Sequence, residues 1–101
     1  MKRTIAIALV VLFLAPALCL AEMTGEEVYK KSCGFCHDNG VANSPKLGDK
    51  DAWKPRLAEG MDVMYESAIK GDGAMPAKGG NAALSDDEVK AAVDFMVEKS
   101  K

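Results

Sequence analysis

A chain of 101 residues has room for a single domain, and it carries 15 acidic residues against 13 basic ones. The resulting formal net charge of −2 excludes a function based on a basic nucleic-acid-binding surface. With three cysteines and one histidine, the side chains that could bind a metal or form covalent bonds are confined to very few positions.

The N-terminal segment has the layout of a secretory signal peptide: two basic residues, an unbroken apolar run over residues 5–15, and a small residue, Ala21, at the end. We predict a signal peptide over residues 1–21, cleaved in a periplasmic protein, and one domain over residues 22–101. An uncleaved membrane anchor is the alternative. It is disfavoured because the apolar stretch is at the short end of the roughly 17–25 residues that span a bilayer, and because Pro16 interrupts it.

Cys19 stands where bacterial lipoproteins carry their acylated cysteine, but that motif wants a small residue before the cysteine and Leu18 occupies the place. Lipidation is therefore disfavoured. Cleavage after Ala21 would remove Cys19 and leave only Cys33 and Cys36, and we expect no stable membrane insertion of the cleaved protein.

A domain this small usually needs a disulfide, a metal or a cofactor to hold it together.

Capping signals predict the first and last helices. Thr24 and Glu27 have the spacing of a capping box, and the helix should run on into Cys33. Gly25 is costly in a first turn, but its missing side chain would let another helix approach. Residues 85–88 repeat the capping box, and the helix after them has a buried stripe of Val89, Ala92, Val93, Met96 and Val97.

Two shorter helices are predicted between these. One contains Trp53 and ends at Gly60, and its Pro55 should stand near the first turn, where a backbone N–H has no helical partner. The other covers residues 61–70, where apolar residues recur at helical spacing, and ends at Gly71. No segment reads as a strand, so the predicted fold class is all-α, with about four short helices.

The segment Cys33-Gly34-Phe35-Cys36-His37 has the Cys-x-x-Cys-His layout of covalent haem attachment. Positions three and four apart share one face of a helical turn, so both thiols and the imidazole can address one flat group. We predict that Cys33 and Cys36 form thioethers to one haem c and that His37 ligates its iron. A structural zinc site needs four ligands and a thioredoxin-like dithiol needs a βαβ setting, neither of which the chain offers.

Met75 is predicted to be the second axial ligand. Because the chain has one histidine, His/His coordination within one chain is excluded. Met1 belongs to the predicted signal peptide, and Met23 lies at the N-terminus of the mature chain. Three more methionines lie on apolar helical stripes, where methionine usually fills a core: Met61, Met64 and Met96. Met75 alone lies in a glycine-rich loop, where Pro76 restricts its backbone. A carbonyl in the loop 43–47 is the candidate partner for the other ring nitrogen of His37.

Trp53 and Arg56 are three residues apart and share a helical face. An indole N–H and a guanidinium could both bind a haem propionate. A core tryptophan beside a solvated arginine is the alternative that spacing alone leaves open.

Together these residues resemble the class I c-type cytochromes, and most closely the cytochrome c5 group. The resemblance covers Gly25 to Met96 and rests on Gly25 with Tyr29, the Cys-x-x-Cys-His segment, Pro45-Lys46-Leu47-Gly48-Asp49, Trp53 with Arg56, Gly60, Met75-Pro76-Ala77-Lys78-Gly79-Gly80 and Leu84-Ser85-Asp86. It implies a cytochrome c fold wrapped around one covalently bound haem. In that fold the first and last helices cross, which would bring Gly25 to Phe95.

The resemblance also implies Met75 as the distal ligand, the Pro45 carbonyl as the partner of the His37 ring N–H, and Trp53 and Arg56 near the propionates. Some members of the group carry an extra cysteine pair near the methionine loop, which this sequence lacks.

The function expected from these features is that of a small soluble carrier of single electrons between periplasmic or membrane-bound redox proteins. It would not be an enzyme, because an iron with both axial positions filled has no open site. Lys46 and Lys78 are candidate contacts for the donor and acceptor. The alternatives are a haem-based peroxidase or gas-binding sensor with Met75 labile or absent from the iron, and an interaction module in which Cys33 and Cys36 form only a redox dithiol.

Overall fold

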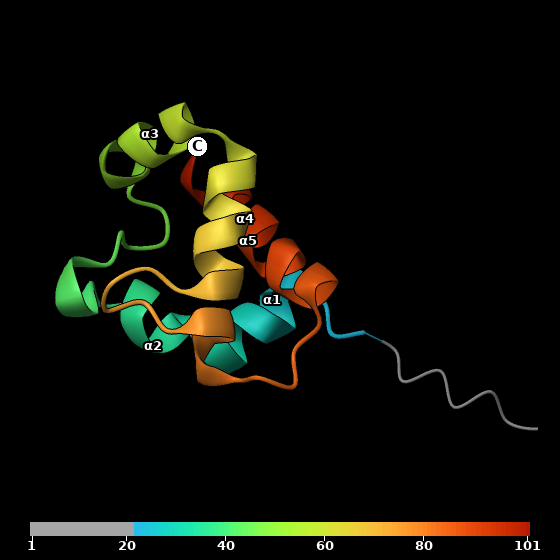
Figure 1. The fold of residues 1–101 in the computed structure, drawn as a ribbon. Coiled ribbons are helices and arrows are strands. Elements are labelled where there is room, and N and C mark those ends of the chain that lie inside the picture. The colour runs from blue at the N-terminus through green and yellow to red at the C-terminus, as the bar shows by residue number, and fades with distance from the viewer. Residues whose placement is uncertain (1–21) are drawn as a thin grey trace, which may run out of the picture.

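The computed structural model describes residues 22–101, so the predicted signal peptide, its anchor alternative and Cys19 lie outside the described residues. Within residues 22–101 there is no β-strand, and the helices form four units (Figure 1). The first unit joins α1 (Gly25–Val28), the π-helical turn η1 (Tyr29–Cys33) and α2 (Gly34–His37) without a break. The others are α3 (Lys50–Glu59), α4 (Met61–Lys70) and α5 (Asp86–Ser100), with 3₁₀ turns η2 (Val41–Asn43) and η3 (Ala77–Gly80) in the loops. The predicted all-α fold is confirmed.

Both predicted capping boxes are present. The Thr24 hydroxyl accepts from the Glu27 N–H at 3.2 Å, and the Ser85 hydroxyl accepts from the Glu88 N–H at 3.0 Å. The first helical unit runs past Cys33 to His37, further than predicted, and η1 forms a π-helical turn between α1 and α2. The Cys-x-x-Cys-His segment is therefore helical throughout.

α1 packs across the N-terminal half of α5, as expected from the resemblance (Figure 1). The nearest neighbour of Gly25 is Ala91 and not the expected Phe95. A Cβ atom on Gly25 would lie 2.1 Å from the Ala91 carbonyl oxygen, so Gly25 meets Ala91. Phe95, one turn further along α5, packs instead on Tyr29, with 5.3 Å between ring centroids. The two pairs lie one helical turn apart because both helices advance together along the crossing.

The α3 helix contradicts one expectation. Pro55 stands in the middle of α3 and not in its first turn. A proline there cannot donate to the carbonyl four residues earlier, that of Asp51. Both Asp51 and Pro55 are exposed, so water can serve that carbonyl and the helix continues to Gly60 as predicted.

The core forms where α5 meets α1, α3 and α4. Its fully buried side chains include Val28 and Met96, and the predicted α5 stripe is buried along its whole length. α4 has the predicted bounds, contributes Met64 and Ala68 to the core, and ends at Gly71 with φ +85°. Among the described residues, no helix has the length and apolar character required to cross a membrane.

Candidate functional site

A cavity of about 480 Å³ lies between the helical units, within the usual size range of cofactor sites. Its lining comes from the first unit, α3, α4, α5 and the loops that join α2 to α3 and α4 to α5. All of the site residues predicted from the sequence line it: Cys33, Cys36, His37, Pro45, Trp53, Arg56 and Met75. Segments far apart in the chain are thus brought to one space.

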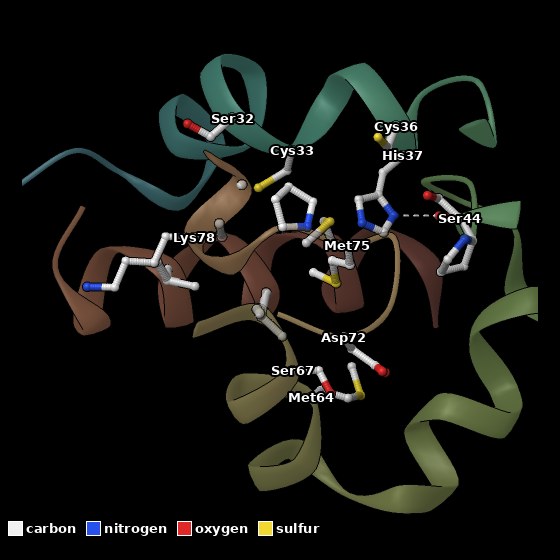
Figure 2. A pocket seen from close by; sticks show the side chains of 18 of the residues that line it. Ser32, Cys33, Cys36, His37, Ser44, Met64, Ser67, Asp72, Met75 and Lys78 are labelled. Atoms are coloured by element: carbon white, nitrogen blue, oxygen red, sulfur yellow. Dashed lines mark hydrogen bonds between the residues drawn. The ribbon is translucent and has the colours of Figure 1, made fainter. Parts of the chain in front are cut away.

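His37 is buried and held at two points by the loop that follows it. Its Nδ1 lies 2.8 Å from the Pro45 carbonyl oxygen, and its own carbonyl accepts from the Leu47 N–H at 2.8 Å. A carbonyl only accepts hydrogen bonds, so Nδ1 carries the proton and Nε2 keeps its lone pair. Figure 2 shows the opposite edge of the ring turned toward the Met75 side of the cavity. An imidazole fixed in this way is prepared to ligate a metal through Nε2.

Cys33 and Cys36 are half-buried free thiols on the same helical unit as His37. Burial raises the pKa of the Cys33 thiol to about 11, so it is protonated at neutral pH. Reactive redox dithiols depend on the opposite shift, toward an easily formed thiolate. The environment of Cys33 therefore disfavours the redox-dithiol alternative.

Met75 belongs to the loop of residues 71–84, on the side of the cavity away from the Cys-x-x-Cys-His helix (Figure 2). Its backbone pairs twice with Asp72, each N–H donating to the other residue's carbonyl at 3.0 Å. Gly71 lies against this turn, because a Cβ there would be 3.0 Å from the Met75 carbonyl oxygen. The loop thus presents a thioether to the same space as the His37 imidazole.

Trp53 and Arg56 line the cavity, but the Trp53 indole N–H does not have the role suggested from the sequence, that of a propionate donor. The Trp53 Nε1–H donates to the Lys46 carbonyl at 2.8 Å, so its single donor is already used and does not reach a propionate. Trp53 instead packs beside the His37 ring, with centroids 5.8 Å apart. Arg56 uses Nη1 for the Ala52 carbonyl and keeps its other donors, so the guanidinium remains a candidate partner for a carboxylate.

Sequence reasoning did not anticipate two backbone contacts around His37. The Leu47 N–H donates to the His37 carbonyl, and the Lys46 carbonyl accepts from the Trp53 indole N–H. Every residue type except proline has the same backbone N–H and C=O groups, so the residue types at these positions do not signal the two contacts. The only sequence indication was the Pro45-Lys46-Leu47 segment that contributes to the resemblance.

The donor set fits a covalently held haem better than a free metal ion. Within residues 22–101, no three or more His, Cys, Asp or Glu side chains are grouped so as to hold a metal. Two thiols, one imidazole with a free Nε2 and the thioethers of Met64, Met75 and Met96 instead border a space large enough for a flat macrocycle, and Met75 alone of these methionines lies in a loop and not on a helix. An all-α domain with such a site defines a c-type cytochrome.

Comparison with known proteins agrees. Residues 21–96 match the family described as Cytochrome C oxidase, cbb3-type, subunit III. Cytochrome c-555 of Chlorobaculum tepidum is 49% identical over 81 residues, which cover 76% of this chain and 75% of that protein. Cytochrome c5 of Azotobacter vinelandii is 44% identical, with 72% and 90% covered. A chain in the crystal structure of an electron transfer complex of nitrite reductase with cytochrome c is 48% identical, with a TM-score of 0.72 and 76% and 94% covered.

The chain belongs to the class I monohaem c-type cytochromes, a family that includes cytochrome c5. The predicted family, the cytochrome c fold and the single covalently attached haem c are confirmed. The protein is an electron carrier and not an enzyme, as predicted.

Proposed function

We propose that this protein carries single electrons between periplasmic or membrane-bound redox proteins, with His37 and Met75 as the two axial ligands of its haem iron. Cys33 and Cys36 would form the thioethers, and Pro45, Trp53 and Arg56 would complete the haem environment. When bound, the haem supplies a one-electron couple between ferric and ferrous iron. A thioether ligand and a buried setting favour a raised reduction potential.

The observation that carries the proposal is the hydrogen bond of 2.8 Å between His37 Nδ1 and the Pro45 carbonyl. It fixes the imidazole tautomer with Nε2 free, and Trp53 packs beside the ring and limits its rotation. Met75 approaches the same cavity from a different segment. Ligands fixed by contacts from separate segments of the chain change little between redox states, which suits electron transfer more than binding of a small molecule.

The experiment is to expose the reduced, purified holoprotein to carbon monoxide without oxygen and then to titrate its potential. We expect an absorption spectrum that carbon monoxide leaves unchanged and a reversible one-electron transition. Rapid binding of carbon monoxide by the wild-type protein would instead support the gas-binding or peroxidase alternative, with Met75 absent from the iron.

Export is the remaining part of the proposal. Residues 1–21 have the signal-peptide layout and the described helices include none able to cross a membrane. We expect the holoprotein in the periplasmic fraction, with a mass that corresponds to a chain starting at Glu22. A membrane-bound protein that keeps its N-terminus would contradict cleavage without affecting the ligand assignment.

A further inference from the structure

We infer that Lys78 is a positioning residue for Met75. Its ammonium group ties the methionine loop to the start of α5 and does not face a redox partner. This inference rests on the proposed coordination of the iron by His37 and Met75, and it concerns what keeps Met75 in place.

The methionine loop has little packing of its own. Between Gly71 and Ala83 every residue is half-buried or exposed, and the first buried residue after Met75 is Leu84. Met75 packs against the core, but its neighbours Ala74 and Pro76 are exposed, so apolar contacts within the protein restrain this segment at few points. No disulfide braces it either, because the free Cys33 and Cys36 are the only cysteines among residues 22–101. Polar and backbone contacts must hold the loop.

Lys78 makes two of these contacts with a single charged group. Its Nζ donates to the Leu84 carbonyl at 2.8 Å and lies 3.2 Å from Asp86 Oδ1, at the first residue of α5. The Lys78 side chain is only 24% exposed, whereas that of Lys70 on α4 is 71% exposed. Figure 2 shows Lys78 extending away from the space between His37 and Met75. The earlier expectation that Lys78 contacts a redox partner is therefore replaced by a role inside the domain.

The backbone of Lys78 gives a second, independent sign of restraint. Its φ of +55° lies in the left-handed region, which is strained for a residue that carries a Cβ atom. Such a conformation persists only where the surroundings impose it. The next residue, Gly79, lies against the helix that carries the cysteines, because a Cβ there would be 2.4 Å from the Ser32 carbonyl oxygen. Lys78 and Gly79 thus fasten the loop at two adjacent points to different helices.

The restraint reaches Met75 through a short, ordered stretch. Residues 77–80 form η3, and the Gly79 N–H donates to the Pro76 carbonyl at 3.3 Å. Pro76 has a fixed φ and is bonded directly to Met75. Release of the Lys78 ammonium would therefore free the far end of this turn and increase the fraction of time that Met75 is away from the iron.

Imidazole binding to the ferric holoprotein measures that fraction, because imidazole must wait for Met75 to leave and its apparent affinity scales with the open population. We expect Lys78→Leu to raise the affinity about tenfold, since it removes a hydrogen bond from a charged donor worth about 1.4 kcal/mol. Lys78→Arg should restore nearly wild-type affinity. Lys70→Leu, which removes the same charge from an exposed ion pair, is the matched control and should change nothing.

A second pair of variants tests whether the Asp86 carboxylate acts through Lys78 or only as a negative charge in the first turn of α5. Asp86→Asn should raise imidazole affinity about twofold, because the carboxylate is exposed and contributes less than the carbonyl. Asp87→Asn, a like change in the same turn, should have no effect. If Lys78→Leu does not accumulate as holoprotein, this pair and Lys78→Arg decide the question.

Equal imidazole affinity for wild type, Lys78→Leu and Asp86→Asn, with the Met–ferric absorption band present, would overturn the role of Lys78 alone. A wild-type protein without that band, whose imidazole affinity Met75→Ala does not change, would overturn the ligand assignment itself. The two failures are thus distinguishable.

Discussion

The crossing of α1 and α5 and the loop that carries Met75 are built in opposite ways. At the crossing, capped helices bury apolar side chains such as Val28 and Met96 and approach so closely that Gly25 touches the backbone of Ala91. The loop buries none of its residues between Gly71 and Ala83. It is held by backbone pairs, by glycines pressed against other segments and by one lysine.

This contrast separates stability from coordination. Burial of apolar surface is the main stabilising contribution in a small domain, so damage at the crossing should unfold the protein. Of residues 71–83 only Met75 packs against the core, so damage elsewhere in the loop should free an iron ligand while the fold persists. The same division explains how one short chain can carry a stable core beside a segment devoted to a single thioether.

The largest effect is expected from Gly25→Val, which would break the crossing itself. A Cβ at this position lies 2.1 Å from the Ala91 carbonyl oxygen and 2.6 Å from its carbon, and backbone atoms cannot move aside. We expect a loss of at least about 3 kcal/mol in the free energy of unfolding, measured by denaturant titration of the holoprotein. In an uncrowded helix, replacement of this glycine would be neutral or stabilising, so an unchanged midpoint would contradict the close approach.

Met64→Ala should have the next largest effect and sharpens the comparison with Met75. Met64 lines the cavity like Met75 but lies buried on α4, so its loss leaves a void and costs about 2–3 kcal/mol in stability. Thermal unfolding of the two holoprotein variants provides the measurement. If Met75→Ala were as unstable as Met64→Ala and equally closed to carbon monoxide, stability and coordination would not be separable.

Tyr29→Phe should have a moderate effect at the crossing. The Tyr29 hydroxyl donates to Asp38, just beyond His37, and we expect a loss of about 1 kcal/mol when it is removed. Tyr65→Phe removes a like bond to Asp94 at the exposed surface and should cost less. Denaturant midpoints of the two variants measure the difference, and equal losses would contradict a special role for the part-buried Tyr29–Asp38 pair.

The same tyrosine predicts a dependence on alkaline pH. Burial, followed by the hydrogen bond to Asp38, raises the pKa of Tyr29 far above its ordinary value of 10. The folded protein therefore keeps this proton at a pH where the unfolded chain has lost it. Its stabilising contribution is complete below a pH of about 10 and declines as pH rises further. Tyr29→Phe should show a flatter decline in this range, and parallel curves would contradict the assignment.

The smallest effect is expected on the outer surface of the first helix. Lys30 pairs with Glu26 at 3.2 Å, and both side chains are more than half exposed. Lys30→Ala should change the free energy of unfolding by less than about 0.5 kcal/mol, because solvent screens such pairs. Denaturant titration at low and at high salt tests this, and a loss above 1 kcal/mol would mean that the pair belongs to the crossing.

Features that depend on neighbouring residues could be predicted from the sequence. The capping boxes at Thr24 and Ser85, the bounds of α4 and the buried stripe of α5 follow from spacing along one helix. The Cys-x-x-Cys-His segment and the isolated position of Met75 likewise identified residues that line one cavity.

Features that depend on residues far apart in the chain could not be predicted from the sequence. Whether Gly25 meets Ala91 or Phe95 is decided by the register of two helices more than sixty residues apart. The Lys78 side chain turns inward because of the positive φ of Lys78 and the hydrogen bond to the Leu84 carbonyl. Neither feature can be recognised from residue types. Pro55 in mid-helix is tolerated because its surroundings are exposed, which the sequence alone does not state.

The central claim is that Met75 completes the iron coordination opposite His37. Absorption spectra of the ferric holoprotein, compared for wild type, Met75→Ala and Met64→Ala, test it most directly. We expect the weak long-wavelength band of Met–ferric coordination in wild type and in Met64→Ala, and its loss in Met75→Ala together with a lower reduction potential and open binding of carbon monoxide. A band that survives in Met75→Ala, or that disappears only in Met64→Ala, would contradict the account.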